Sequence, residues 1–212
     1  MLRISNIFMN LNSTEEDLKN KIFKILKTNK INSMSIFKKS IDARNKSNVR
    51  FVFSVDIDID NEEKYLKWKN ITSVKKYSYN IIRPINNLKN RPVVIGAGPA
   101  GLFAGLILAQ AGLNPIIIER GKPVEERKKD IDEFWTTGKL LNNSNIQFGE
   151  GGAGAFSDGK LTTGITDNRI RKVLLELVES GAPSEILILA KPHIGTDNLK
   201  IVIKNLREKI IT

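Results

Sequence analysis

The sequence predicts two consecutive domains of different classes: an α+β domain over residues 1–82 and an α/β domain with a parallel sheet over residues 93–212. Two shifts in composition favour this division. All 15 glycines of the chain lie at or after Gly96. The net charge is +9 up to residue 90 but only +2 beyond it. We expect residues 83–92, which two prolines bracket, to be the linker between the domains.

The first domain shows strand and helix patterns in a recognisable order. Ser13-Thr-Glu-Glu16 is a capping-box pattern, and after it apolar residues recur at helical spacing. The predicted elements are a strand, a helix, two strands, a short helix and a last strand, over residues 2–8, 18–26, 33–39, 49–59, 62–68 and 71–79. The order β-α-β-β-α-β is that of a ferredoxin-like domain.

The fold and the positive charge of this domain make RNA a candidate partner, because related folds stack RNA bases on aromatic residues of a central strand. Arg50-Phe-Val-Phe53 superficially resembles that feature, but the glycines of the RNA-recognition signature are absent. Phe51 and Phe53 also share a strand face with Val55 and Ile57, so a core face explains them more simply. The lysines more often form a solvated face, or contact an anionic ligand or an acidic protein. We expect no DNA partner.

The second domain opens with two apolar runs separated by a glycine-rich turn and a helix. We expect a buried parallel strand, a helix and a second strand over residues 93–95, 100–111 and 114–118. Gly112 suits the C′ position of the helix. Glu119 ends the second strand, 18 residues after Gly101. This is the layout of a dinucleotide-binding βαβ unit. Structural packing alone does not explain why a carboxylate closes an apolar strand.

Each residue of the turn Gly96-x-Gly98-Pro99-Ala100-Gly101 has a physical role in such a unit. Gly96 allows the sharp turn, Gly98 lets a pyrophosphate approach the backbone, and Gly101 lets the helix pack close to the strand. The helix N-terminus, with Pro99 and Ala100, offers unpaired N–H groups and a positive dipole end. Glu119 can accept hydrogen bonds from a ribose 2′-hydroxyl and would repel a 2′-phosphate.

A second glycine-rich stretch covers residues 149–161. It contains Gly154-x-x-x-x-Gly159-Lys160, but Leu161 stands where a phosphate-binding P-loop needs Ser or Thr. We therefore reject a nucleoside triphosphatase. The small residues favour a second wall for the same dinucleotide, whose backbone N–H groups point at anionic oxygens. A tight structural turn against the sheet is the alternative.

Few residues indicate chemistry directly. The chain has no cysteine and one histidine, His193, which lies in a loop before a helix that Thr196 or Asp197 would cap. His193 is a weak candidate for an acid or base, and Lys160 for placing a positive charge beside a bound anionic group; structural roles are at least as common for both. No metal-ligand constellation is present. Without a signal peptide or a membrane-spanning run, we expect a cytoplasmic protein.

Together these motifs resemble those of the uncharacterised bacterial FAD-dependent dehydrogenases, which have a glutathione-reductase-like FAD domain. The resemblance covers nearly the whole chain and rests on residues 40–44, 91–104, 118–121, 149–161 and 191–197. It implies that Gly96, Gly98, Gly101 and Glu119 bind FAD rather than NAD. It also implies a wider set near the FAD: Arg120, Arg127, Gly151, Gly152, Ala153, Gly154, Ser157 and Asp158. Arg127 could equally be a solvated helix residue.

FAD domains of this type carry a late strand that ends in Gly-Asp. This sequence departs from that pattern, because it contains no Gly-Asp dipeptide. We therefore expect the N-terminal portion of a longer FAD-dependent oxidoreductase, which uses an unknown substrate and for which NAD(P)H is a possible electron donor or acceptor. The 212-residue chain alone should be inactive and should bind FAD poorly. The alternatives are an RNA- or partner-binding protein with a degenerate flavin domain, and an NAD-dependent oxidoreductase.

Overall fold

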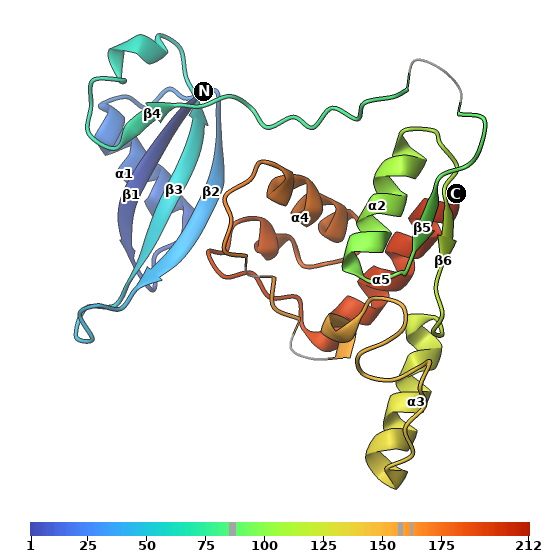
Figure 1. Ribbon diagram of the computed structural model, residues 1–212. Helices are drawn as coiled ribbons and strands as arrows, with labels where there is room; N and C mark the ends of the chain where they lie inside the picture. Colours follow the sequence, from blue (N-terminus) through green and yellow to red (C-terminus); the bar gives the residue numbers. More distant parts are fainter. Residues whose placement is uncertain (85–87, 157–158, 162) are drawn as a thin grey trace. The chain divides into compact units, whose positions relative to one another are not determined.

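The computed structural model describes residues 1–84, 88–156, 159–161 and 163–212. It divides into two compact units, which are described separately. The first unit is Met1–Ser78 together with Leu187–Lys191, and the second is Tyr79–Ile186 together with Pro192–Thr212. Figure 1 labels the helices and strands of both units. The expected linker, residues 83–92, falls within the second unit, and residues 85–87 lie outside the described part.

The first unit is a four-stranded antiparallel sheet with one long helix. Its strands are β1 (Leu2–Asn10), β2 (Ser33–Asp42), β3 (Arg50–Asp58) and β4 (Ile71–Ser73), in the order β2-β3-β1-β4. Helix α1 (Glu15–Leu26) buries Leu18, Ile22 and Leu26 in one core with Phe53, Val55 and Ile57 of β3. The prediction that alternate residues of this strand form a core face is confirmed.

Three local predictions for this unit need correction. The capping box is Thr14 with Asp17, one residue later than Ser13 with Glu16; Thr14 Oγ1 accepts from the Asp17 N–H, and Asp17 accepts from the Thr14 N–H. The predicted second helix is only a 3-10 turn, η1 (Glu62–Lys64), since Asn61 and Asn70 adopt left-handed conformations and leave room for little more. The last strand stops at Ser73 instead of Tyr79.

Residues 187–191 complete the first unit at the free edge of β2. The Lys39 N–H donates to the Ile188 carbonyl (2.6 Å), and the Ala190 N–H donates to the Lys39 carbonyl (3.0 Å). Leu189 thereby pairs with Lys39 in the parallel sense. No sequence pattern predicts this pairing, because the partners are about 150 positions apart and the segment has no strand pattern.

The described residues of the second unit form a short parallel sheet and four α-helices. Strands β5 (Val93–Ile95) and β6 (Ile116–Ile118) pair in parallel, joined by α2 (Pro99–Gln110). Its other helices are α3 (Val124–Thr137), the 3-10 turn η2 (Ala153–Phe156), α4 (Arg169–Glu179), the 3-10 turn η3 (Ser184–Leu187) and α5 (Thr196–Ile211). Helices α2 and α5 pack together through Leu102, Leu106, Val202 and Leu206, which are all buried. The predicted strand, helix, strand order is confirmed (Figure 1).

Two predictions for this unit are wrong in detail. We expected β5 to be buried, but Val93 is 55% exposed and Ile95 is 86% exposed. Only Val94 turns toward α2, and no described segment covers the other face. The N-cap of α5 is Gly195, so neither Thr196 nor Asp197 caps this helix. No helix among the described residues is long and apolar enough to cross a membrane.

Candidate functional site

The turn between β5 and α2 has the geometry that its glycines predict. Gly96 has a φ of +95°, which favours glycine, and its N–H donates to the Ile118 carbonyl (2.7 Å). A Cβ on Gly101 would lie 1.8 Å from the Gly96 carbonyl oxygen, so α2 can pack this close only with glycine there. Gly98 is the N-cap of α2, and Pro99 follows in the first turn. Pro99 and Ala100 are exposed, so this helix N-terminus is open to a ligand.

Gly98 differs from its two neighbours in the motif. Its φ is −68°, an ordinary value, and a Cβ built on it would meet nothing within 4 Å. Gly154 in the second loop is also without a left-handed φ and without a neighbour within 4 Å. Neither the backbone conformation nor the packing of this chain therefore requires glycine at these two positions. Both leave room for a group from outside the chain.

Glu119 lies at the carboxyl end of β6 and faces the same turn. One of its carboxylate oxygens accepts from the Ala97 N–H and the other from the Gly121 N–H, both at 2.7 Å. A carboxylate oxygen can accept more than one hydrogen bond, so both oxygens keep capacity for a hydroxyl group. The two backbone bonds hold the carboxylate in place at the strand end, where ligands of open α/β sheets bind.

The second glycine-rich loop packs directly against the first. The Gly151 N–H donates to the Ala97 carbonyl (2.8 Å). A Cβ on Gly152 would lie 3.1 Å from Pro99 Cδ, and one on Gly121 would lie 2.5 Å from Gly149 Cα. Ala153 and Gly154 are exposed at the start of η2. The structure thus brings together two loops that are about 50 residues apart in the sequence.

Arg127 of α3 is the residue that holds this second loop. It is fully buried, and its guanidinium donates to the carbonyls of Glu150, Gly152 (3.0 Å), Asn145 (2.7 Å) and Ile146 (3.2 Å). Burial lowers the pKa of this guanidinium. The alternative in which Arg127 is a solvated helix residue is wrong. Its role in this structure is to position the loop backbone.

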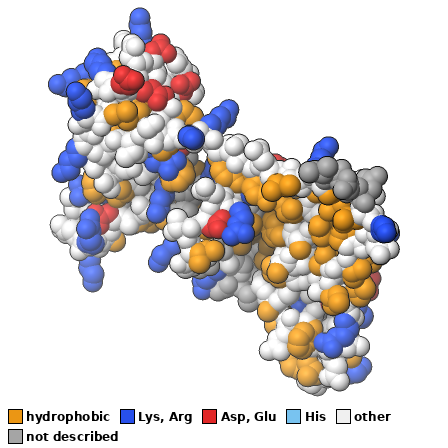
Figure 2. Space-filling view, turned by 45° about the horizontal axis from the view of Figure 1, so that its top comes forward, with side chains coloured by type: hydrophobic (Ala, Val, Ile, Leu, Met, Phe, Trp, Pro, Cys, Tyr) orange, Lys and Arg blue, Asp and Glu red, His pale blue; other side chains and the backbone are white. Residues whose placement is uncertain are grey.

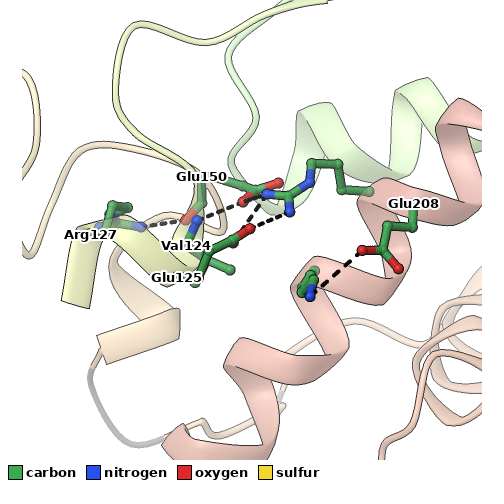
Figure 3. Close-up of polar contacts among 7 residues, drawn as sticks. Val124, Glu125, Arg127, Glu150 and Glu208 are labelled. Carbon is green, nitrogen blue, oxygen red and sulfur yellow. Dashed lines mark hydrogen bonds and ion pairs between the residues drawn. The ribbon is translucent and has the colours of Figure 1, made fainter. Parts of the chain in front are cut away.

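A buried carboxylate links the same loop to two helices (Figure 3). Glu150 accepts from the Val124 N–H at the start of α3 (2.7 Å) and from Arg207 of α5 (2.7 Å). Arg207 also binds Glu125 (2.6 Å). Burial, the largest influence, raises the pKa of Glu150, although the Val124 N–H and Arg207 act in the opposite direction.

Sequence reasoning missed Glu150 and Arg207. Glu150 stands between glycines in a loop, and Arg207 lies on an amphipathic helix, where a charged residue is usually solvated. The two are 57 positions apart, and no spacing pattern links them. Only the packing of α5 against α3 and the loop brings them together.

Other predicted residues lie at the margins of the two loops. Arg120 is exposed, and its guanidinium carbon is 5.2 Å from the centre of the Phe148 ring. Lys160 and His193, both exposed, are backbone partners in an isolated antiparallel bridge. The structure therefore places the two weak chemical candidates side by side. Ser157 and Asp158 lie outside the described residues.

A cavity of about 800 Å³ runs along β6 and the end of α5. It reaches Ala97 and Glu119 at one end and Asn114 at the other, but Gly98 does not line it. It is therefore a groove beside the sheet and not the seat that the glycine turn predicts for a pyrophosphate. Among the described residues, no group of three or more His, Asp or Glu could hold a metal ion.

Comparison with known proteins supports a flavin-binding region. Residues 91–129, which include both strands of the parallel sheet, Glu119 and Arg127, match the family model described as an FAD binding domain. Residues 1–58 match a domain of unknown function. An uncharacterized protein of Clostridium beijerinckii is 46% identical over 218 residues, a match that covers 99% of this chain. The chain spans 40% of that relative's length.

Proposed function

We propose that the chain is the N-terminal, cofactor-binding part of an FAD-dependent oxidoreductase, and that this enzyme is a dehydrogenase. The pyrophosphate is assigned to the turn Gly96-x-Gly98-x-x-Gly101 and the open N-terminus of α2. The adenosine ribose is assigned to Glu119. The FAD-binding match over residues 91–129 supports the nature of the ligand.

The observation that carries this proposal is the space at Gly98. Gly96 and Gly101 are explained by a left-handed φ and by a close helix–strand contact. Gly98 has neither reason, and it lies beside the first-turn amides of α2, which have no partner inside the helix. A phosphate approaching those amides needs the volume that a Cβ would take.

The second loop is assigned as the other wall of the FAD site. The wall consists of Gly151, Gly152, Ala153 and Gly154. Gly151 is hydrogen-bonded to the backbone of the first loop, and Ala153 and Gly154 are exposed. Arg127 acts behind this wall, because its guanidinium binds the loop carbonyls and is fully buried. We retain Arg120, Ser157 and Asp158 as expected neighbours of the cofactor.

When bound, the flavin would supply the redox chemistry, and the chain supplies position and charge. Lys160 can place a positive charge near a reduced flavin, and His193 beside it can hold or release a proton at an imidazole nitrogen. NAD(P)H is a possible electron donor or acceptor.

We assign the first unit as a variant of the ferredoxin-like fold. The strand order β2-β3-β1-β4 with antiparallel neighbours supports this assignment, and the second helix is reduced to η1. The RNA alternative gains no support from the sheet. The guanidinium groups of Arg3 and Arg50 lie over the rings of Phe37 and Phe8, which would otherwise be open to stacking bases.

A titration of FAD fluorescence tests the proposal with two proteins: the 212-residue chain, and the same chain joined to the remaining part of the Clostridium beijerinckii relative. We expect weak binding by the first and FAD retained through gel filtration by the second. NAD⁺ should not displace it. If the folded, joined protein takes up no FAD, the proposal is wrong.

A further inference from the structure

The parallel sheet of the second unit has one apolar face that no described segment covers. Four β-branched side chains form this bare face: Val93 is 55% exposed, Ile95 86%, Ile116 38% and Ile118 53%. They alternate with Val94 and Ile117, which turn toward α2. Figure 2 shows that hydrophobic side chains gather over this unit.

Two physical arguments say that such a sheet is incompletely packed. Parallel sheets are almost always covered on both faces, and two short strands are only marginally stable alone. Helix α2 is apolar around its whole circumference, which is typical of a helix inside a core. Yet Phe103, Ile107 and Leu108 of α2 are only half-buried.

The outer edge of β6 offers hydrogen bonds as well as apolar surface. The Ile116 N–H donates to Pro92, and the Ile118 carbonyl accepts from Gly96, both on the β5 side. Because backbone groups alternate along a strand, the N–H and carbonyl of Ile117 point away from β5. The groove of about 800 Å³ lies on this side, and Ile117 and Ile211 line it.

We propose that the bare face and the β6 edge form one docking surface for polypeptide. The occupant is a polypeptide segment that corresponds to the part of the Clostridium beijerinckii relative outside the matched region. It adds a strand parallel to β6 and lays an aliphatic layer over Ile95 and Ile118. Two observations favour this occupant: the backbone groups of Ile117 face the open edge of β6, and the matched region makes up only 40% of the relative's length. The inference does not depend on FAD.

Association in trans tests the inference. The 212-residue chain is co-expressed with the remaining part of the Clostridium beijerinckii protein, and the complex is measured by native mass spectrometry. We expect a one-to-one complex. Ile95→Lys and Ile118→Lys should each weaken it by at least about tenfold, because a charge is then buried in an apolar contact. Both residues are exposed here, so the variants should fold. Ile201→Lys on α5, at a position 57% exposed, is the matched control and should leave the complex unchanged.

Hydrogen exchange gives a second measurement that does not need the separate parts to be soluble. When the 212-residue chain and the remaining part of the relative are joined as one polypeptide, the amide of Ile117 should exchange at least about tenfold more slowly than in the 212-residue chain alone. Unchanged exchange at this amide would overturn the inference. So would a wild-type complex that survives both lysine variants, or a bare face that is buried by a second copy of this chain.

Discussion

Glycines of the same motif have different physical reasons at the residue scale. Gly101 is fixed by the carbonyl of Gly96, which a Cβ would approach to 1.8 Å, whereas Gly98 meets nothing within 4 Å. The sequence predicted both roles from spacing alone, because the turn, the helix start and the acid at position 119 form a local pattern. It left two interpretations of Arg127 open, since burial depends on the distant loop that covers it.

A pair of alanine variants separates these two roles. Gly101→Ala should lower the free energy of unfolding by about 1–3 kcal/mol, because the methyl group must displace backbone atoms. Gly98→Ala should cost no more than about 1 kcal/mol, since the new methyl group meets open space and only the preference for glycine over alanine at this N-cap is lost. Urea unfolding followed by circular dichroism measures both. Equal losses of stability in the two variants would contradict the assigned roles.

Contacts between elements hold the second loop, and they could not be predicted from the sequence. Glu150 joins the loop to the start of α3 and to α5, and its partner Arg207 is 57 positions away. Sequence patterns predicted most elements of the chain well because apolar periodicity is local. They failed at η1, where two asparagines in left-handed conformations shorten the helix, and at β5, whose burial depends on what covers it.

Removing Arg207 tests the link between α5 and the loop. Arg207→Gln leaves the buried Glu150 without its charged partner, so the amides of Gly151 and Gly152 should exchange with solvent at least several times faster. Lys204→Gln is the control, because Lys204 lies on the same helix and pairs only loosely with Glu208, at 3.8 Å (Figure 3). Similar exchange in both variants would show that the ion pair does not hold the loop.

A second buried carboxylate joins α4 to α2 and α5. Glu176 accepts from Gln110 (2.8 Å), Lys172 and Lys209 (2.6 Å). Burial would raise the pKa of Glu176, but these hydrogen bonds outweigh it and lower the pKa from 4.5 to about 2. A carboxyl group with a depressed folded-state pKa stabilises the fold above its unfolded pKa and loses this contribution as the pH falls.

The pH dependence of stability should therefore change in Glu176→Gln. The wild-type protein should lose stability between about pH 4.5 and 2, and the variant should lose less over the same window. Thermal unfolding across this range measures the difference. Glu179→Gln, at an ion-paired position that is 58% exposed, should keep the wild-type slope. An unchanged slope in Glu176→Gln would contradict the role assigned to its hydrogen bonds.

At the scale of the whole molecule, the residues that the structure describes form two hydrophobic cores that share no residue. One contains Ile22 and the strands of the first unit, and the other contains Leu106 and the helices of the second. The shift in glycine content and charge near residue 90 indicated two domains, because composition changes at such boundaries. The return of residues 187–191 to the first sheet had no such signal.

Separate cores should respond separately to cavity-forming substitutions. Ile22→Ala and Leu106→Ala remove fully buried side chains and should each cost about 2–5 kcal/mol. Hydrogen exchange resolved by peptide should show the loss in the first unit for Ile22→Ala and in the second for Leu106→Ala. Loss across the whole chain in either variant would mean that the two units unfold as one.

The measurement that tests the central claim most directly is FAD affinity in the chain joined to its relative's remaining part, with valine at two matched glycines. Gly98 and Gly164 both lack a left-handed φ and both have empty space around a built Cβ, but only Gly98 lies in the predicted pyrophosphate seat. Gly98→Val should weaken FAD binding by at least about tenfold, with a loss of stability of only about 1 kcal/mol from replacing glycine at the N-cap, and Gly164→Val should change neither FAD affinity nor stability. Equal FAD affinity in the two variants would contradict the account.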